Sequence, residues 1–185
     1  FVPALQAISV SIDNEVLRDM YANLLAKSVY VETSAQAHPA YVDIIRQMSP
    51  IDAVIFKEIN KNPKNQTAFP IKEFGIANKK DGSVIQSNAY LTNLDLYDVS
   101  IVSTSLSNLV RLGLYNKIDD HVFDISLYDD IDKNPEVVKF CDKETSEYIK
   151  DPINQYVVCE KGVLFQTTFG TLFYNICCKD IDLGA

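Results

Sequence analysis

The stretch Val102-Ser-Thr-Ser-Leu-Ser-Asn-Leu-Val-Arg-Leu-Gly-Leu114 predicts a helix with an apolar and a polar side. The apolar residues recur at helical spacing, and they are Val102, Leu106, Leu109, Val110 and Leu112. The other side carries small polar residues and one cation, namely Ser100, Thr104, Ser107, Asn108 and Arg111. Gly113 follows, and glycine is the residue most often found just after a helix C-terminus. We therefore expect a helix over 100–112 with its polar side outward.

Two further stretches extend this pattern. In Ser49-Pro-Ile-Asp-Ala-Val-Ile-Phe-Lys-Glu-Ile59, the serine and the proline are joint signals for a helix start. In Gly162-Val-Leu-Phe-Gln-Thr-Thr-Phe-Gly170, a β-rich run leads into Thr167, which can cap a last helix. A helix, a helix ending in Leu-Gly-Leu and a strand running into Thr-x-x-Gly, in this order, resemble a winged-helix core. In that fold the helix over 100–112 would be the recognition element.

Helices are also expected before this core. Asp13 is a candidate N-cap for a helix that reaches residue 29 and has one apolar side. Its other side carries Ala22 and Ala26, which leave room for a second helix to approach. Residues 41–48 predict a shorter amphipathic helix. Gly170, inside the predicted last helix, would allow close packing.

Two hairpins are expected among the β-rich segments. Residues 70–91 contain two such runs on either side of the turn-forming cluster Asn78-Lys-Lys-Asp-Gly82. Residues 156–167 predict a second hairpin that turns at Lys161-Gly162.

Charge is concentrated in one part of the chain. The net charge of the 185 residues is −8, and residues 119–161 hold twelve acidic side chains against five lysines, a net of −7. This segment occupies the place of the wing and contains a helix that begins at Asn134-Pro135. We therefore predict an α+β fold in which N-terminal helices pack on a winged-helix-like core with an elaborated acidic wing. Residues 1–48 would be the helical segment and 49–185 the core with insert 119–161, together in one compact unit.

Neither metal nor catalytic chemistry has a signature here. Four cysteines show no C-x-x-C spacing, and only two histidines, His38 and His121, are present. Asp130-Ile-Asp-Lys-Asn134 begins like a calcium loop, but Pro135 and Cys141 stand where that loop needs glycine and glutamate. We expect reduced, partly buried thiols and no metal, cofactor or catalytic residue.

The location of the protein in the cell is predicted from features that the sequence lacks. It has no apolar run long enough to span a bilayer, so we expect no membrane span and a cytoplasmic location. The chain starts with phenylalanine rather than methionine, so we expect it to be part of a longer protein.

Several segments resemble one known family. They are Pro3-Ala-Leu-Gln-Ala, Asn14-Glu-Val-Leu-Arg-Asp-Met-Tyr-Ala-Asn-Leu-Leu-Ala26, His38-Pro-Ala-Tyr-Val-Asp-Ile-Ile-Arg-Gln-Met-Ser-Pro50 and Thr167-Thr-Phe-Gly170. Together they are similar to the Abi-alpha family of bacterial abortive-infection proteins. The resemblance implies a part in resistance to phage and supplies no catalytic residue. Gln166 departs from the strand-to-helix pattern, which normally has leucine there.

Three functions remain open. The first is a non-enzymatic interaction module that binds a protein partner or itself. It would use the helix over 13–29 or the acidic insert, whose candidate residues are Asp129, Asp130, Asp132 and Glu136. The second is a nucleic-acid-binding regulator that uses the polar side of helix 100–112. Binding of DNA commonly needs about 6–10 phosphate contacts, whereas Arg111 and Lys117 are the cations near this helix. The third is an effector enzyme whose site assembles only in the fold, around His38 or His121.

Overall fold

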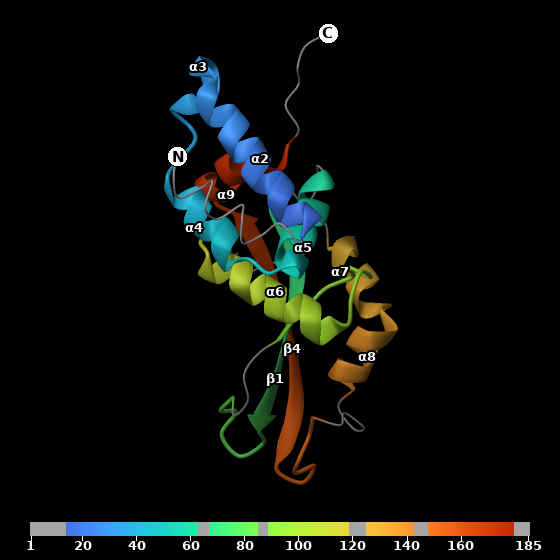
Figure 1. Ribbon diagram of the computed structural model, residues 1–185. Coiled ribbons are helices and arrows are strands. Elements are labelled where there is room, and N and C mark those ends of the chain that lie inside the picture. Colours follow the sequence, from blue (N-terminus) through green and yellow to red (C-terminus); the bar gives the residue numbers. More distant parts are fainter. Residues whose placement is uncertain (1–13, 63–66, 85–88, 119–124, 143–147, 180–185) are drawn as a thin grey trace. The chain divides into compact units, whose positions relative to one another are not determined.

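The computed structural model describes residues 14–62, 67–84, 89–118, 125–142 and 148–179. They form a mixed α+β fold with a four-stranded antiparallel sheet in the order β2-β1-β4-β3 (Figure 1). Contacts group the chain into two units. The helical unit comprises Phe1–Gln66, Asn108–Tyr115 and Gln166–Ala185, and the sheet unit comprises Thr67–Ser107 and Asn116–Phe165.

Capping signals set the starts of the first helices. The helices before the sheet are α2 (Glu15–Val29), α3 (Val31–Ser34), α4 (Ala40–Gln47) and α5 (Pro50–Lys61). Asn14 caps α2 by accepting from the backbone N–H of Leu17; the predicted cap, Asp13, lies outside the described residues. Ser49 caps α5 in a reciprocal capping box with Asp52, so the predicted start is confirmed.

An aromatic cluster fills the core of the helical unit. Phe56 of α5 lies 5.8 Å from the ring of Tyr115 and 5.7 Å from that of Phe173 in α9 (Thr168–Phe173). The ring of Tyr41 in α4 lies 5.3 Å from Phe173. All four side chains are buried. Offset and edge-to-face rings at this spacing add to the stability gained by burial.

Gly170 lets α9 approach the backbone closely. A Cβ atom at this position would lie 2.2 Å from the carbonyl oxygen of Leu114, a distance that no side chain can occupy. Thr167 caps the same helix by accepting from the N–H of Gly170. The predicted cap at Thr167 and the predicted close packing at Gly170 are therefore both confirmed.

Helix α2 uses its polar side for packing within the helical unit. The chain continues from α9 into a π-helical turn, η1 (Tyr174–Cys178). Buried Lys27 donates to the carbonyls of Asn175 and Lys179, and Asn23 donates to that of Cys177. A lysine ammonium at the C-terminal carbonyls of a helical turn satisfies groups that would otherwise lack partners.

Two long antiparallel strands form the centre of the sheet unit. Strand β1 (Ala68–Asn78) pairs with β4 (Gln155–Gln166) from Ala68↔Phe165 to Asn78↔Gln155. On its other edge β1 pairs with β2 (Ala89–Leu91). The predicted hairpin over 70–91 is therefore confirmed, and Gly82 turns it with a φ of 72°.

The hairpin predicted at Lys161-Gly162 is wrong. Both residues lie inside the single strand β4, where Gly162 pairs with Ile71 and Lys161 with Lys72. The pair lacks the positive φ that a tight turn requires, because the described glycines with positive φ are Gly82 and Gly113. Long-range pairing with β1 thus overrides a local turn signal.

Helix α6 (Val99–Arg111) ends as the sequence predicts. Gly113 has a φ of 74°, its N–H donates to Val110, and the N–H of Leu114 donates to Leu109. This is a Schellman motif, which satisfies the last carbonyls of the helix. The chain then enters β3 (Tyr115–Ile118). By the grouping above, α6 begins in the sheet unit and ends in the helical unit.

Two short helices, α7 (Ser126–Asp132) and α8 (Pro135–Cys141), lie beside β1 and β4 (Figure 1). Their inward side chains share a core with the sheet and with the start of α6. The buried members are Phe74, Ile76, Leu91, Val99, Tyr128, Ile131, Val137 and Val157. The predicted helix start at Asn134-Pro135 is confirmed, because Asn134 accepts from the N–H of Glu136. None of the helices described is long and apolar enough to cross a membrane.

Candidate interaction surface

The polar side of α6 is exposed, as the sequence predicts. Ser100, Thr104, Ser107 and Arg111 are all exposed, and Asn108 is half-buried. The hydroxyls of Thr104 and Ser107 donate to backbone carbonyls one helical turn earlier, at 2.9 Å each. These side chains therefore fold back on their own helix.

Arg111, the one cation of α6, is held within the helical unit. Its Nη1 donates to Oε1 of Gln47 at 3.0 Å, and its Nε donates to Oδ1 of Asn108 at 2.8 Å. Asn108 in turn donates to Oδ2 of Asp52, a carboxylate only 4% exposed. A guanidinium engaged in this way would have to leave both partners to reach a phosphate.

Lys117, the next cation along the chain, is also occupied. Its Nζ lies 2.5 Å from Oε1 of Glu73 on β1, and the two side chains are 26% and 12% exposed. Breaking a pair this shielded from solvent costs more than breaking a surface ion pair. The two cations that the sequence offered for DNA contact are therefore bound to neighbours on the protein.

The pair α7–α8 is anchored on its inner side by Tyr128. The hydroxyl of Tyr128 donates to the carbonyl oxygen of Gly162 at 2.9 Å, and Nζ of Lys161 lies 5.1 Å from its ring centroid. Ile131 and Val137 are buried beside it. This spacing of inward residues leaves the acidic positions of both helices on the outside.

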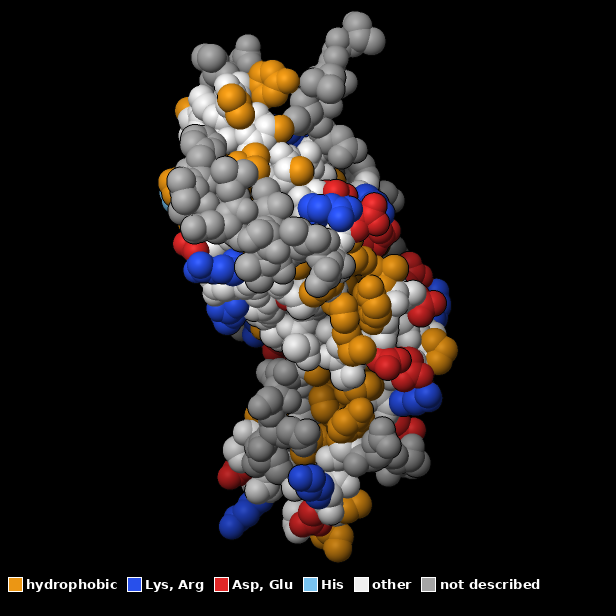
Figure 2. Space-filling view, in the orientation of Figure 1, with side chains coloured by type: hydrophobic (Ala, Val, Ile, Leu, Met, Phe, Trp, Pro, Cys, Tyr) orange, Lys and Arg blue, Asp and Glu red, His pale blue; other side chains and the backbone are white. Residues whose placement is uncertain are grey.

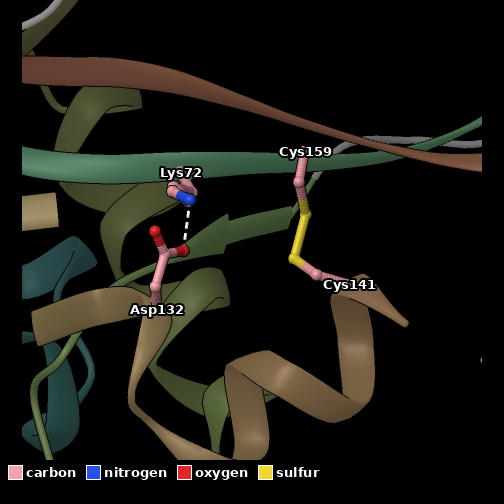
Figure 3. Close-up of a disulfide and its surroundings, with 4 residues drawn as sticks. All are labelled: Lys72, Asp132, Cys141 and Cys159. Atoms are coloured by element: carbon pink, nitrogen blue, oxygen red, sulfur yellow. Dashed lines mark hydrogen bonds and ion pairs between the residues drawn. A yellow bond between two sulfur atoms is a disulfide. The ribbon is translucent and has the colours of Figure 1, made fainter. Parts of the chain in front are cut away.

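All four acidic candidates of the insert, Asp129, Asp130, Asp132 and Glu136, are exposed. Asp130 pairs with Lys133 at 3.7 Å and Glu136 with Lys139 at 2.6 Å, while Asp132 pairs with Lys72 of β1 (Figure 3). Over 125–142, five acidic residues (Asp142 is the fifth) face two lysines. The face formed by α7 and α8 is thus acidic despite these pairs. The two pairs within the helices are exposed and contribute little, whereas Lys72 is largely shielded from solvent.

A disulfide beside this face was not predicted. Cys141, the last residue of α8, is bonded to Cys159 of β4, with 6.2 Å between the two Cα atoms (Figure 3). The prediction of reduced thiols is wrong for this pair and holds for Cys177 and Cys178. The chain brings the first two together by placing the end of α8 over β4, which spacing along the sequence does not reveal.

A shallow cavity of about 280 Å³ opens next to the disulfide. Its lining residues are Asp132, Val137, Val138, Cys141 and Asp142. Figure 2 shows hydrophobic side chains gathered beside α7 and α8, with acidic side chains along their border. Ile125 and Val138, about half exposed, are among the large hydrophobic residues open to solvent. We refer to the surface of α7 and α8 with this cavity as the α7–α8 face.

The residues considered for catalysis are not brought together in the described structure. His38 accepts from the N–H of Ala40 at the start of α4, and its ring contacts Tyr41 and Phe169. His121 lies outside the described residues. Across the part of the chain that the structure describes, no three His, Cys, Asp or Glu side chains could hold a metal ion.

The two free thiols lie in a setting that keeps them protonated. Burial raises the pKa of Cys178 to about 12, and burial followed by repulsion from Cys178 raises the pKa of Cys177 well above its usual value. A nucleophilic cysteine needs the opposite shift, toward the thiolate.

Sequence reasoning also missed why Gln166 replaces leucine. Its Nε2 donates to Oδ1 of buried Asn60 at 2.8 Å, and Nδ2 of Asn60 donates to the hydroxyl of Tyr115 at 2.9 Å. A buried asparagine needs such partners, and leucine at 166 could not supply one. The signal available in the sequence was Asn60, a polar residue next to the apolar residues that α5 buries.

These features define an α+β protein with an exposed acidic face formed by α7 and α8. The family model described as "Abortive infection alpha" matches residues 1–177 of the 185, and the chain belongs to this family. No curated protein and no solved structure matches the chain.

Proposed function

We propose that this chain is a non-enzymatic protein-interaction module of an abortive-infection system and that it binds its partner through the α7–α8 face. Membership of the abortive infection alpha family supports the setting. The observation that carries the proposal is the contrast between two surfaces. The acidic side chains of α7 and α8 point outward, while Arg111 and Lys117 are held by neighbours.

The chemistry of the face indicates the kind of partner. Val137 and Val138 line a cavity that Asp132 and Asp142 border, so an apolar side chain next to a lysine or arginine would fit. Charge complementarity of this kind speeds association and selects partners more than it adds affinity. The partner is then another protein, or another copy of the chain, that presents a basic and apolar segment.

The nucleic-acid regulator is the weaker candidate. The exposed polar side of α6 favours it, and we retain a winged-helix-like core as an interpretation because β3 and β4, neighbours in the sheet, are joined by the helical insert. The division into a segment 1–48 and a core 49–185 stays part of that interpretation. Against DNA binding stands the acidic face in the place of the wing, which would repel a phosphate backbone.

A cytoplasmic location also stays a proposal. A disulfide in a reducing compartment is usually transient or redox-sensing, whereas one in an oxidising compartment persists.

The test is a charge change on the α7–α8 face of the full-length protein, assayed by phage plating on expressing cells. The test variant carries Asp129→Lys, Asp130→Lys and Glu136→Lys. The control variant carries the same number of changes at exposed acids outside this face and outside α2: Asp43→Lys, Asp95→Lys and Glu160→Lys.

We expect the test variant to lose protection and to lose any partner that co-purifies with the wild type, with unchanged thermal unfolding. The control variant should behave as the wild type. Equal protection by both variants would refute the proposal that this face is used.

A further inference from the structure

The Cys141–Cys159 disulfide joins α8, which carries part of the α7–α8 face, to strand β4. Cys141 ends α8, and Cys159 lies in the middle of β4, where it pairs with Phe74 of β1. Figure 3 shows the bond bridging from the end of the helix to the strand. Both residues are half-buried rather than enclosed in the core.

The Cys141 end of this bond borders an open cavity. Cys141 is one of the residues that line the open cavity of about 280 Å³. A small thiol, or a reactive cysteine on another protein, could approach Cys141 from that side. Exposed disulfides are the ones that exchange, while enclosed ones persist.

Attachment differs between the two helices. Helix α7 is held by the Tyr128 hydroxyl bond to Gly162, by buried Ile131 and by the ion pair between Asp132 and Lys72. None of these contacts involves the disulfide.

Besides the disulfide, apolar contacts hold helix α8 to its neighbours. Val137 is buried, and the ring of Phe140 stacks on Tyr148 at 4.5 Å and meets Phe74 edge-on at 5.4 Å. Its outer residues, Glu136, Val138 and Lys139, are exposed. Cleavage of the bond should therefore loosen α8 while α7 stays in place.

We propose that Cys141–Cys159 is a reversible thiol–disulfide exchange site for a dithiol reductant, and that its reduction releases the end of α8 from β4. A thiolate of the reductant attacks Sγ of Cys141, the S–S bond breaks, and Cys159 leaves as a thiolate that takes a proton. The second thiol of the reductant then resolves the mixed disulfide and frees Cys141. The reductant is oxidised to a disulfide, and the protein gains two electrons and two protons.

The charge around the cavity gives the site a preference. Asp132 and Asp142 lie beside Cys141 in the cavity wall. A negatively charged thiol is repelled there and a positively charged one is attracted. Cysteamine should therefore reduce the bond several times faster than mercaptoethanesulfonate, and the ratio should fall in the variant Asp132→Asn/Asp142→Asn.

Hydrogen exchange on the wild-type chain tests the release without any substitution. After reduction with dithiothreitol, the amides near the end of α8 should exchange at least about tenfold faster, while those of α7 change less than about threefold. The variant Cys141→Ser/Cys159→Ser should show the reduced pattern permanently. The variant Cys178→Ser, which keeps the disulfide, should show the oxidised pattern before reduction.

Unchanged exchange in α8 would overturn the inference, and so would equal acceleration in α7. Failure of native-state reduction by millimolar dithiothreitol would also overturn it. The inference does not depend on the partner proposed above, because every readout is made on the chain alone. Its failure would leave the proposed function standing, and the reverse is also true.

Discussion

Gly170 lies in the first turn of α9, where the helix passes directly over the backbone of Leu114. The variant Gly170→Ala would place a Cβ atom 2.2 Å from the carbonyl oxygen of Leu114 and 3.0 Å from its carbonyl carbon. Ordinary contact begins at 3.4 Å, so one backbone segment must move by more than 1 Å. Neither neighbour is a flexible side-chain tip that can turn aside.

The loss of stability in this variant can be derived from the contacts around residue 170. Moving α9 strains the bond from the Thr167 hydroxyl to Gly113 at 2.7 Å and the one from the Thr167 N–H to Leu114 at 3.1 Å. Overpacking costs about 1–3 kcal/mol and each weakened hydrogen bond about 1 kcal/mol, while alanine recovers about 1 kcal/mol of helix propensity. We therefore expect Gly170→Ala to lower the free energy of unfolding by about 2–4 kcal/mol.

Urea unfolding followed by far-ultraviolet circular dichroism measures this change. Gly162→Ala is the matched control, because a Cβ there meets Ile71 at an ordinary 3.5 Å. Alanine in a strand interior should be neutral, or stabilising by up to about 1 kcal/mol. A Gly170→Ala protein within about 0.5 kcal/mol of the wild type would refute the close-approach argument, as would an equal loss in the control.

Three further predictions concern the helical unit and its charges. Asn60→Ala removes a buried partner of Tyr115 and Gln166 and should cost about 2–3 kcal/mol in urea unfolding; a loss as small as that of an exposed substitution would contradict the bonds described. Arg111→Ala should leave DNA retention unchanged in a salt titration, because no salt-dependent binding is expected from the wild type; steep binding that this variant weakens would favour the regulator. Burial holds the pKa of Cys178 at about 12 against an ordinary 9.0, so the folded protein keeps a proton that the unfolded chain releases. Stability is then complete below pH 9 and falls as the pH rises toward 12, by at most about 1.4 kcal/mol per pH unit for this group. Unfolding measured at pH 8, 9 and 10 should show the fall. The fall should be smaller in Cys178→Ser but not absent, because burial also raises the pKa of Cys177.

Signals that act over a few residues were readable from the sequence. The starts of α5, α8 and α9 follow from Ser49, Asn134 and Thr167, because each side chain accepts a hydrogen bond from its own first turn. The end of α6 follows from Gly113, because the motif needs a positive φ. The polar side of α6 followed from helical spacing in the same way.

Features that depend on distant partners were not readable. Lys161-Gly162 has the composition of a turn, yet pairing with β1 holds it in a straight strand. Cys141 and Cys159 carry no spacing signature, and they bond because α8 ends above β4. Arg111 donates a hydrogen bond to Gln47, a residue that is remote along the chain and close only in the folded protein.

The sequence by itself determined where several of the helices begin or end, which of their sides are apolar and where the negative charge lies, since these depend on residues within one or two turns. The tertiary structure decided which cations are free to act, which cysteines are bonded and which acids remain exposed. The physical reason is that hydrogen bonds, ion pairs and disulfides act over a few ångströms of space, whatever the distance along the chain.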